Sequence, residues 1–441
     1  MPPTVPSGIP CISVVFARLV VGTEDRGIKP FLVPLHDGKR MHAGISTRLL
    51  SPRGGSRPVE HALTYFRHVR LPQSALLGKI DRDEDVKATF FHNISRVISG
   101  TLCMGTLGIN GMRMAAFIAA KYSQRRTVWD AFKRSPRPII SFSTQYLPIL
   151  TGIAQTYVMD AFGHASRERF AGAQDLVMRH FVAAVFKTTV MKLASEVIYG
   201  LGDRCGAQGL FEVNQLSVML VRRLSPCHSS SLTLVLQPEL RGAAIAEGDT
   251  LAISIRFTVD VLLGRIDIPP SDNPASLLAK HECALLDELR AFVQEAAGHR
   301  DARTESLILP RCQELIQAIG FRFAYDDAVA HGVQPQLLDL FVASVLTNSE
   351  AWYMKSEGLS RWDQHTKLIE AANALYPQLD SLLEHWQIGQ YVTAPIVSEE
   401  KWDAYVQSLE VDGDPLNITR QTMSGFSAPL ETVELSARAR L

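Results

Sequence analysis

The sequence predicts a mainly α-helical protein that begins with a β segment. Residues 12–35 and 62–69 alternate apolar and polar side chains, which is typical of half-buried strands. From residue 81 onwards the pattern changes to long segments with helical periodicity, and helices return after a proline-rich linker at 269–274. We therefore expect a partial β domain over 1–80, a helical domain over 81–268 and a second, C-terminal helical domain over 269–441.

The composition of the chain narrows its class. Its 441 residues are enough for two or three domains, and 45 basic residues balance 45 acidic ones. The charge therefore does not favour nucleic acid or a membrane surface as a partner. The six cysteines are scattered without metal-ligand spacing, so we expect free thiols in a reducing compartment and no metal site.

Two features bear on membranes and targeting. The apolar run 97–120 is interrupted by Asn110 and Arg113, which favours a buried helix over a membrane span. Residues 1–11 lack a basic region followed by an apolar core, so we expect no secretory signal. The chain ends in Ala439-Arg440-Leu441, a small–basic–leucine ending of the peroxisomal type. We expect a peroxisomal location and otherwise a cytoplasmic one.

The β segment is expected to hold strands at 12–21, 31–35 and 62–69. A turn at Asp25-Arg26-Gly27 separates the first two strands, and Pro72 closes the third.

Three long helices are expected next, at 86–121, 139–170 and 172–201. Residues 221–239 then interrupt the helical pattern, because Pro226 stands close to a serine cluster. This stretch is either a real loop near the site or an insertion left by an imperfect gene model.

Glu247 is the first candidate for chemistry. It stands among the small and aliphatic residues of 243–248. A carboxylate that apolar neighbours desolvate is a better base, and a base is needed to remove a weakly acidic C–H proton. The alternative is structural, with Glu247 capping or beginning a helix that runs from about Asp249 to Leu263. Spacing alone leaves both interpretations open.

Two short runs resemble the C-terminal catalytic segment of acyl-CoA oxidases and dehydrogenases. Residues 205–210 read Cys-Gly-Ala-Gln-Gly-Leu, where that family has a Cys-Gly-Gly-x-Gly-Tyr type of turn, and residues 247–250 read Glu-Gly-Asp-Thr. The resemblance implies that Glu247 takes the α-proton of an acyl thioester while the β-hydride goes to FAD. It also implies that Gly206 and Gly209 belong to a cofactor-binding turn.

The β segment carries the same resemblance. Residues 59–72 are similar to a Val-Asp-Asn-Gly-x-Leu-x-Phe-x-x-Val-Arg-Ile-Pro segment of the oxidases, and residues 15–19 and 27–35 match the strands that precede it. The run 60–62 reads Glu-His-Ala where the family has Asp-Asn-Gly, so the expected substrate loop is altered.

Two further positions match residues that contact the flavin nucleotide in that family. The resemblance implies that Arg126 reaches the FAD pyrophosphate of a neighbouring subunit and that Gln145 faces the nucleotide, which requires a homodimer. Without the resemblance, the pair Arg125-Arg126 is a solvated feature of a helix end, and Gln145 is an ordinary polar residue on a helix face.

The resemblance begins in the middle of the family's architecture. It implies an oxidase-like helical bundle without the N-terminal helical domain that supplies one wall of the acyl pocket. Two functions therefore remain open. The first is FAD-dependent oxidation of an acyl-CoA to the trans-2-enoyl-CoA, with oxygen as electron acceptor, in fatty-acid β-oxidation or secondary metabolism. The second is a non-catalytic relative that serves as a dimerisation or scaffold partner.

Overall fold

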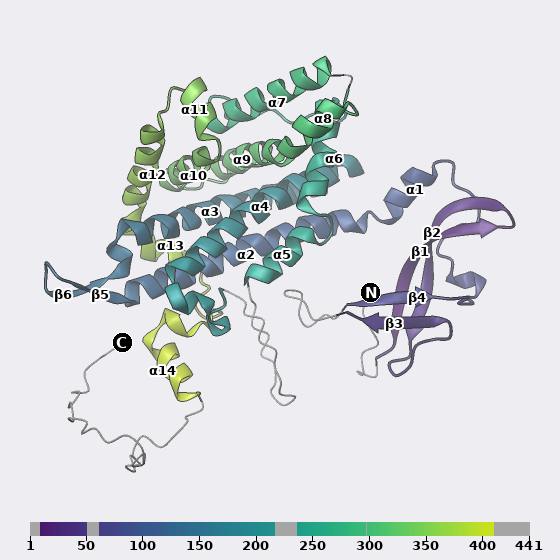
Figure 1. Cartoon of the computed structure of the whole chain (residues 1–441), viewed down its shortest axis with the longest axis horizontal. Helices are drawn as coiled ribbons and strands as arrows, with labels where there is room; N and C mark the ends of the chain where they lie inside the picture. The colour runs from purple at the N-terminus through teal and green to yellow at the C-terminus, as the bar shows by residue number, and fades with distance from the viewer. Residues whose placement is uncertain (1–8, 51–60, 217–235, 297, 410–441) are drawn as a thin grey trace, which may run out of the picture.

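The structure of the protein, a computed structural model, describes residues 9–50, 61–216, 236–296 and 298–409. It has a helical body and a β segment that lies at one end of it (Figure 1). This arrangement confirms the predicted fold class. The predictions for residue 60, for 221–235 and for the C-terminal tripeptide lie outside the described residues.

The β segment consists of two antiparallel hairpins. β1 (Cys11–Val21) pairs with β2 (Glu24–His36), and β3 (Ile45–Leu49) pairs with β4 (Ala62–Phe66). A short 3-10 turn, η1 (Gln73–Ala75), follows. The small core of this segment is formed by Val33, Leu35 and Ile45.

The chain reverses between β1 and β2 at Gly22 and Thr23, so the predicted turn at residues 25–27 is wrong. Gly22 has a φ of 63°, a left-handed conformation that glycine adopts at little cost. Residues 25–27 lie inside β2, where the amide of Gly27 donates a 2.8 Å hydrogen bond to the Asp25 carboxylate. The Asp-Arg-Gly run therefore marks an irregular part of a strand.

The helical body is built around three long helices, which follow a short one. These are α1 (Val86–Asn93), α2 (Arg96–Arg125), α3 (Ser143–Gly172) and α4 (Leu176–Arg204). The predicted helix at 86–121 is thus two helices, with a break at Ile94 and Ser95.

α2 packs closely against α4 because its glycines leave room for large side chains. A Cβ at Gly105 would lie 2.4 Å from the Phe186 ring, and a Cβ at Gly108 would lie 2.7 Å from Val190. Among the described helices, α2 alone is long and apolar enough to cross a membrane, and 56% of its apolar window is buried inside the protein. The apolar run at 97–120 is therefore accounted for by a core helix.

A β-hairpin projects from the far end of α2 (Figure 1). β5 (Thr127–Asp130) pairs with β6 (Ser135–Pro138), and η2 (Ile139–Ser141) leads into α3. Trp129 is 68% exposed on this hairpin and Phe132 is fully exposed.

Shorter elements pack on α4, the first of them at its C-terminal end. They are η3 (Gly206–Leu210), η4 (Glu212–Asn214), α5 (Leu236–Ile245) and α6 (Thr250–Leu262).

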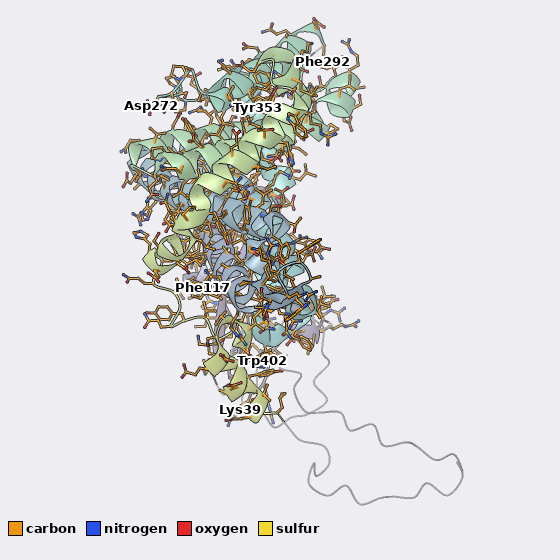
Figure 2. All side chains as sticks on the ribbon, turned by 90° about the vertical axis from the view of Figure 1, so that its left-hand side faces the viewer. Lys39, Phe117, Asp272, Phe292, Tyr353 and Trp402 are labelled. Carbon is orange, nitrogen blue, oxygen red and sulfur yellow. The ribbon has the colours of Figure 1, made fainter. Side chains whose placement is uncertain are left out.

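The remaining helices form further layers on α3 and α4, which Figure 2 shows from the side with Tyr353 in these layers and Phe117 in α2. The longer ones are α7 (Leu277–Glu295), α9 (Cys312–Ala330), α10 (Pro335–Leu346) and α12 (Arg361–Leu375). The shorter ones are α8 (Ala302–Leu307), η5 (Leu309–Arg311), η6 (Thr347–Ser349), α11 (Glu350–Ser356), η7 (Tyr376–Gln378), α13 (Leu379–His385), η8 (Pro395–Val397) and α14 (Glu399–Gln407).

Buried polar contacts fix these layers to the first helices. Arg169 of α3 donates to Asp327 of α9, with one of the two bonds at 2.7 Å. Arg322 of α9 pairs with Glu282 of α7 and donates to the carbonyl of Pro269 in the linker at 2.9 Å. One continuous apolar core joins α2, α3 and α4 to α9 and α10.

Candidate active site

Glu247 lies in a tight turn between α5 and α6. Its φ is 55°, and that of Gly248 is 109°. A left-handed conformation costs a non-glycine residue about 1–2 kcal/mol, because its Cβ approaches the following carbonyl. Strained residues of this kind persist where the surrounding structure holds them, and they gather at functional sites. The contacts that hold Glu247 therefore indicate what the turn is for.

Two buried side chains hold three consecutive carbonyl groups of the turn. The ammonium of Lys187 donates to the carbonyl oxygens of Ala246 and Gly248, both at 2.5 Å. The hydroxyl of Thr101 donates to the carbonyl oxygen of Glu247, also at 2.5 Å. α4 and α2 thus fix the backbone on both sides of the glutamate.

Lys187 is fully buried in α4. Burial lowers the pKa of its ammonium to about 8, and the nearby Asp249 and Glu247 carboxylates partly oppose this shift. The side chain therefore still carries its charge at neutral pH, where it faces the two carbonyls and the acidic turn.

The remaining residues of the Glu-Gly-Asp-Thr run have structural tasks. Asp249 is the N-cap of α6 and accepts hydrogen bonds from the amides of Leu251 and Ala252 at 3.0 and 3.1 Å. The alternative interpretation, in which Glu247 caps or begins a helix from about Asp249 to Leu263, thus predicted α6 correctly. The residue that caps this helix is Asp249, however, and not Glu247. The side chain of Glu247 has no hydrogen bond or ion pair within the part of the chain that the structure describes.

The Glu247 side chain lies over Gly100 in α2. A Cβ at position 100 would lie 2.7 Å from the carboxyl carbon Cδ and 3.0 Å from Oε1. Glycine is therefore required here for the carboxylate to take this position. Glu247 is half-buried in a single chain, with α2 on one side of it.

The other predicted site residues lie at the opposite end of α2. The Gln145 amide nitrogen donates to the Ser123 hydroxyl and to the carbonyl of Arg204, both at 2.8 Å, so its two N–H groups already have partners. Gly209 packs directly on α4, since a Cβ there would lie 2.1 Å from the carbonyl oxygen of Gly202. Gly206 has a φ of 57° and open space around it.

Arg126 is the C-cap of α2 and is exposed beside the β5–β6 hairpin. Its guanidinium has no hydrogen bond or ion pair to any described residue. A free guanidinium presents five N–H donors that suit phosphate oxygens. This group is therefore available to a ligand that reaches the end of the helix.

The predicted site residues thus form two groups that are far apart. At 1.5 Å per residue, the helix places Gly100 and Arg126 roughly 39 Å apart along its axis. That separation exceeds the distance between the ring and the pyrophosphate of one flavin nucleotide. Glu247 and Arg126 of one chain therefore cannot serve the same ligand.

The residues fit a flavin nucleotide at two points. The free guanidinium of Arg126 suits its pyrophosphate, and the unpaired carboxylate of Glu247 is available beside a reacting substrate. Gln145 can offer a nucleotide only its amide oxygen, because its nitrogen is bonded internally.

Lys187, Thr101 and Gly100 were not predicted from the sequence. Lys187 had a usable signal, because it is the one charged residue in the mostly apolar run 181–191. Gly100 and Thr101 had none, since their role depends on a contact with a residue some 150 positions further along the chain.

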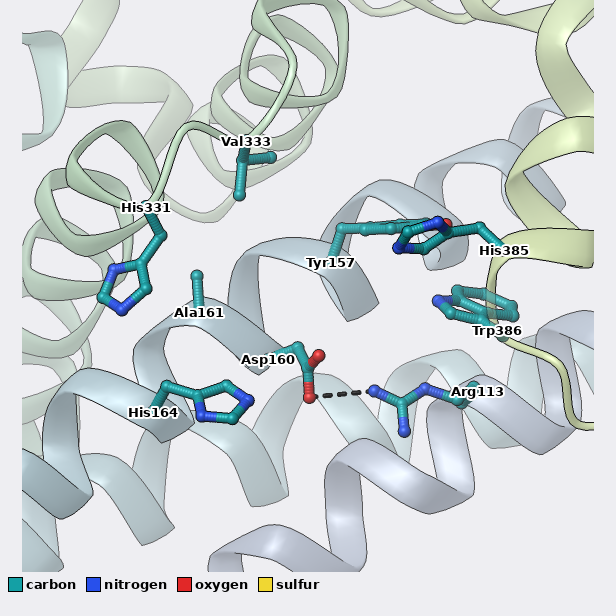
Figure 3. A pocket seen from close by; sticks show the side chains of 9 residues that line it. All are labelled: Arg113, Tyr157, Asp160, Ala161, His164, His331, Val333, His385 and Trp386. Atoms are coloured by element: carbon teal, nitrogen blue, oxygen red, sulfur yellow. Dashed lines mark ion pairs between the residues drawn. The ribbon is translucent and has the colours of Figure 1, made fainter.

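Two cavities among the described residues lie elsewhere and do not include Glu247. The larger, of about 350 Å³, is shown in Figure 3. Its floor carries the ion pair between Arg113 of α2 and Asp160 of α3, at 2.8 Å, and Tyr157 stacks on Trp386 at its side. No residue predicted for the site borders it.

Comparison with known proteins supports the resemblance seen in the sequence. The chain is 24% identical to human peroxisomal acyl-coenzyme A oxidase 3 over 234 residues, which cover 47% of this chain and 33% of that protein. It is 22% identical to the peroxisomal acyl-coenzyme A oxidase 2 of Arabidopsis thaliana over 449 residues, which cover 95% of this chain and 63% of that protein. No family-wide sequence profile matches the chain.

Solved structures show the same fold. Acyl-CoA oxidase 1 of Arabidopsis thaliana aligns with a TM-score of 0.72 and 16% identity, over 93% of this chain and 70% of that one. Acyl-CoA oxidase 3 of Yarrowia lipolytica aligns with a TM-score of 0.74 and 14% identity, over 96% and 71%. The chain is therefore acyl-CoA oxidase-like in sequence and fold, and it spans between a third and two thirds of the length of the two curated relatives.

Proposed function

We propose that the protein is a flavin-dependent, acyl-CoA oxidase-like enzyme in which Glu247 removes the α-proton of an acyl-CoA. One observation carries this proposal. Glu247 is held in a left-handed backbone conformation by two buried side chains, while its own carboxylate has no partner among the described residues. A backbone held on both sides and a carboxylate without a partner suit a base that must stay available to a substrate.

The residues of this chain divide the work as follows. Glu247 accepts the α-proton, and Lys187 and Thr101 hold the backbone of the turn that carries it. FAD, when bound, would take up the hydride from the β-carbon, which leaves a trans-2-enoyl-CoA, and oxygen would be the final electron acceptor. A positioned general base contributes about 10²–10⁴-fold to such a reaction.

The proposed assembly is a homodimer with two shared sites. Each site combines Glu247 from one copy with Arg126 from the other, since the two lie at opposite ends of α2. The exposed Trp129 and Phe132 lie on the hairpin that follows Arg126 and are suited to a contact with the second copy. Gly206, Gly209 and the backbone near Gln145 lie at the same end and would border the nucleotide.

We further propose a peroxisomal location and a role in fatty-acid β-oxidation or secondary metabolism. The names of the curated relatives include peroxisomal acyl-CoA oxidases, and the ending Ala439-Arg440-Leu441 is consistent with that compartment. The division into domains at residues 80 and 268 belongs to the same proposal.

A flavin-binding and half-reaction experiment tests the function. The full chain is purified with FAD, its visible absorbance is recorded, and it is mixed anaerobically with hexanoyl-CoA or palmitoyl-CoA. We expect a bound flavin whose absorbance is bleached by at least one of these substrates. A protein that takes up flavin but is bleached by no saturated acyl-CoA contradicts the proposed reaction.

The scaffold role is the second candidate, and the hairpin favours it. Trp129 and Phe132 would support a contact between copies whether or not the site is active. A stable dimer that takes up no flavin in the same experiment would support this role over the enzymatic one.

A further inference from the structure

A second cavity lies among the C-terminal helices, away from the Glu247 turn. It has a volume of about 250 Å³ and is lined by residues of α4, α7, α9, α10, η6 and α11. At about 30 Å³ per water molecule it has room for roughly eight waters or one small organic molecule. The residues that matter for its chemistry are His281, Tyr353, Gln313, Gln317, Lys192 and Phe321.

Two largely buried side chains line this cavity and make no hydrogen bond to a described residue. His281 is 9% exposed and Tyr353 is 1% exposed. Within the described residues, neither ring nitrogen of His281 nor the hydroxyl of Tyr353 makes a hydrogen bond, although His281 packs edge-on against Trp352 at 4.9 Å. These polar atoms are not among the enclosed atoms without a partner, so they open into the cavity, where a water or a ligand can bind them.

The two groups are uncharged at neutral pH. Burial lowers the pKa of His281, so its ring is neutral and offers one donor and one acceptor. Burial raises the pKa of Tyr353, so its hydroxyl stays protonated. The cations near the cavity already have partners: Arg311 is shared between Glu288 and the lining residue Glu314, at 2.6 and 3.1 Å, and Lys192 pairs with Glu196 at 2.7 Å.

The rest of the lining is mixed. The amide groups of Gln313 and Gln317 can donate and accept, and Phe321 and Leu278 supply apolar surface. A hydroxyl group also both donates and accepts, whereas a carboxylate or phosphate only accepts and would need an unpaired cation. The cavity therefore matches a molecule with several hydroxyl groups and a carbon face.

We propose that this cavity, named here the His281 pocket, binds a small uncharged polyol or sugar-like molecule. His281 and Tyr353 bind its hydroxyl groups at the bottom of the pocket, and Gln313 and Gln317 bind them nearer the rim. The proposal does not depend on the acyl-CoA reaction.

The test follows the His281 ring by NMR. The protein is labelled with ¹³C only at the ring carbons of its histidines and titrated with erythritol and with D-glucose. The His281 signal is assigned by its loss in His281→Phe. We expect at least one of these probes to shift the His281 signal saturably, and sodium acetate to leave it in place.

Variants separate a specific site from a general solvent effect. Tyr353→Phe removes one hydroxyl with little change in shape and should weaken the binding by about two- to tenfold, as the loss of one hydrogen bond does. His365→Phe, at an exposed position on α12, is the matched control and should leave the titration unchanged. The proposal is overturned if neither probe shifts the signal saturably, if acetate shifts it instead, or if Tyr353→Phe binds as the unmodified protein does.

Discussion

Lys187 shows how a single buried residue can fix the geometry of a site that it does not enter. A lysine without exposed surface loses its hydration, and two carbonyl oxygens at 2.5 Å replace the water. The same two bonds hold Ala246 and Gly248, the neighbours of the glutamate. The bonds that compensate for burying the charge therefore also fix the turn. Thr101 of α2 adds a third hydrogen bond, to the carbonyl oxygen of Glu247.

Replacing Lys187 by methionine should destabilise the protein by about 2 kcal/mol at pH 7, because two buried carbonyls lose their donor. Urea unfolding measures the change. Lys192→Met is the matched control on the same helix, since Lys192 is partly exposed in an ion pair with Glu196 and such pairs contribute about 0–1 kcal/mol. Equal losses in the two variants would contradict the role assigned to Lys187.

The pH dependence of the same variant gives a separate prediction. The folded pKa of Lys187, about 8, lies below its ordinary value of 10.5. Between these values the unfolded chain holds more protons at this residue, so its contribution to stability rises with pH. The difference in unfolding free energy between the unmodified protein and Lys187→Met should therefore grow from pH 8 to pH 10. The contributions of the other titrating groups cancel in this difference, because both proteins contain them. A difference that shrinks over this range would contradict the buried charge.

Gly100 allows a direct test of the carboxylate's position. Gly100→Ala places a methyl group 2.7 Å from the carboxyl carbon of Glu247, so the side chain must move. We expect acyl-CoA-dependent bleaching to slow at least about tenfold, because a misplaced base loses its alignment with the proton. Gly200→Ala in α4 is the control, since a Cβ there meets nothing within 4 Å. If acyl-CoA bleaches the flavin of Gly100→Ala at the wild-type rate, then Glu247 is not held in this position for catalysis.

At the scale of elements, the long helices were predictable and the short pairings were not. Long apolar periodic runs specify α3 and α4 locally, whereas the break between α1 and α2 at Ile94 and Ser95 involves polar and apolar residues that a helix also accepts. β6 holds two prolines in four residues, a composition that argues against a strand unless it lies at an edge. β6 pairs with β5 because α2 and α3 hold the two ends of the hairpin, and the four residues of β6 carry no signal for that arrangement.

The candidate site was likewise predictable only in part. The residues alone left Glu247 open between a base and a structural role, and the family resemblance favoured the base. Arg126 and Gln145 were also proposed from that resemblance. The clamp of Lys187 and Thr101 could not, because hydrogen bonds between a side chain and a distant backbone leave no pattern in the sequence.

The β5–β6 hairpin is the element that should join two copies. Trp129→Ala combined with Phe132→Ala removes two large exposed side chains and should shift the protein from dimer to monomer without loss of helicity. Trp362→Ala, which removes an equally exposed tryptophan from α12, should leave the dimer intact. Analytical ultracentrifugation and circular dichroism measure the two properties, and a dimer that survives the double substitution would exclude the hairpin as the contact.

At the scale of the whole molecule, the length of α2 decides how the site is assembled. Glu247 lies over its first turns and Arg126 lies at its end, so that one chain offers two half-sites. In the dimer that we propose, a two-fold axis would bring each half-site to that of the other copy and give two complete sites per dimer. The helical layers formed by α7 to α12 support the pair of helices, α3 and α4, that fix this geometry.

Shared sites predict complementation between inactive subunits. Glu247→Gln and Arg126→Ala should each be inactive alone, but a mixed dimer contains one site with both native residues. Random mixing should restore about a quarter of the wild-type rate, because half of the dimers are mixed and each has one of two sites active. The measurement is acyl-CoA-dependent bleaching after the two variants are unfolded and refolded together. No recovery from a confirmed mixed dimer would contradict a shared site.

The central claim is that Glu247 is the base, and the anaerobic half-reaction of Glu247→Gln tests it most directly. The variant keeps the size of the side chain and the clamp of the turn, so it should bind FAD with an unchanged visible spectrum. Bleaching by the acyl-CoA that bleaches the wild-type protein should slow at least about 100-fold, as expected for loss of a general base. Bleaching of the flavin-loaded variant at the wild-type rate would contradict the account.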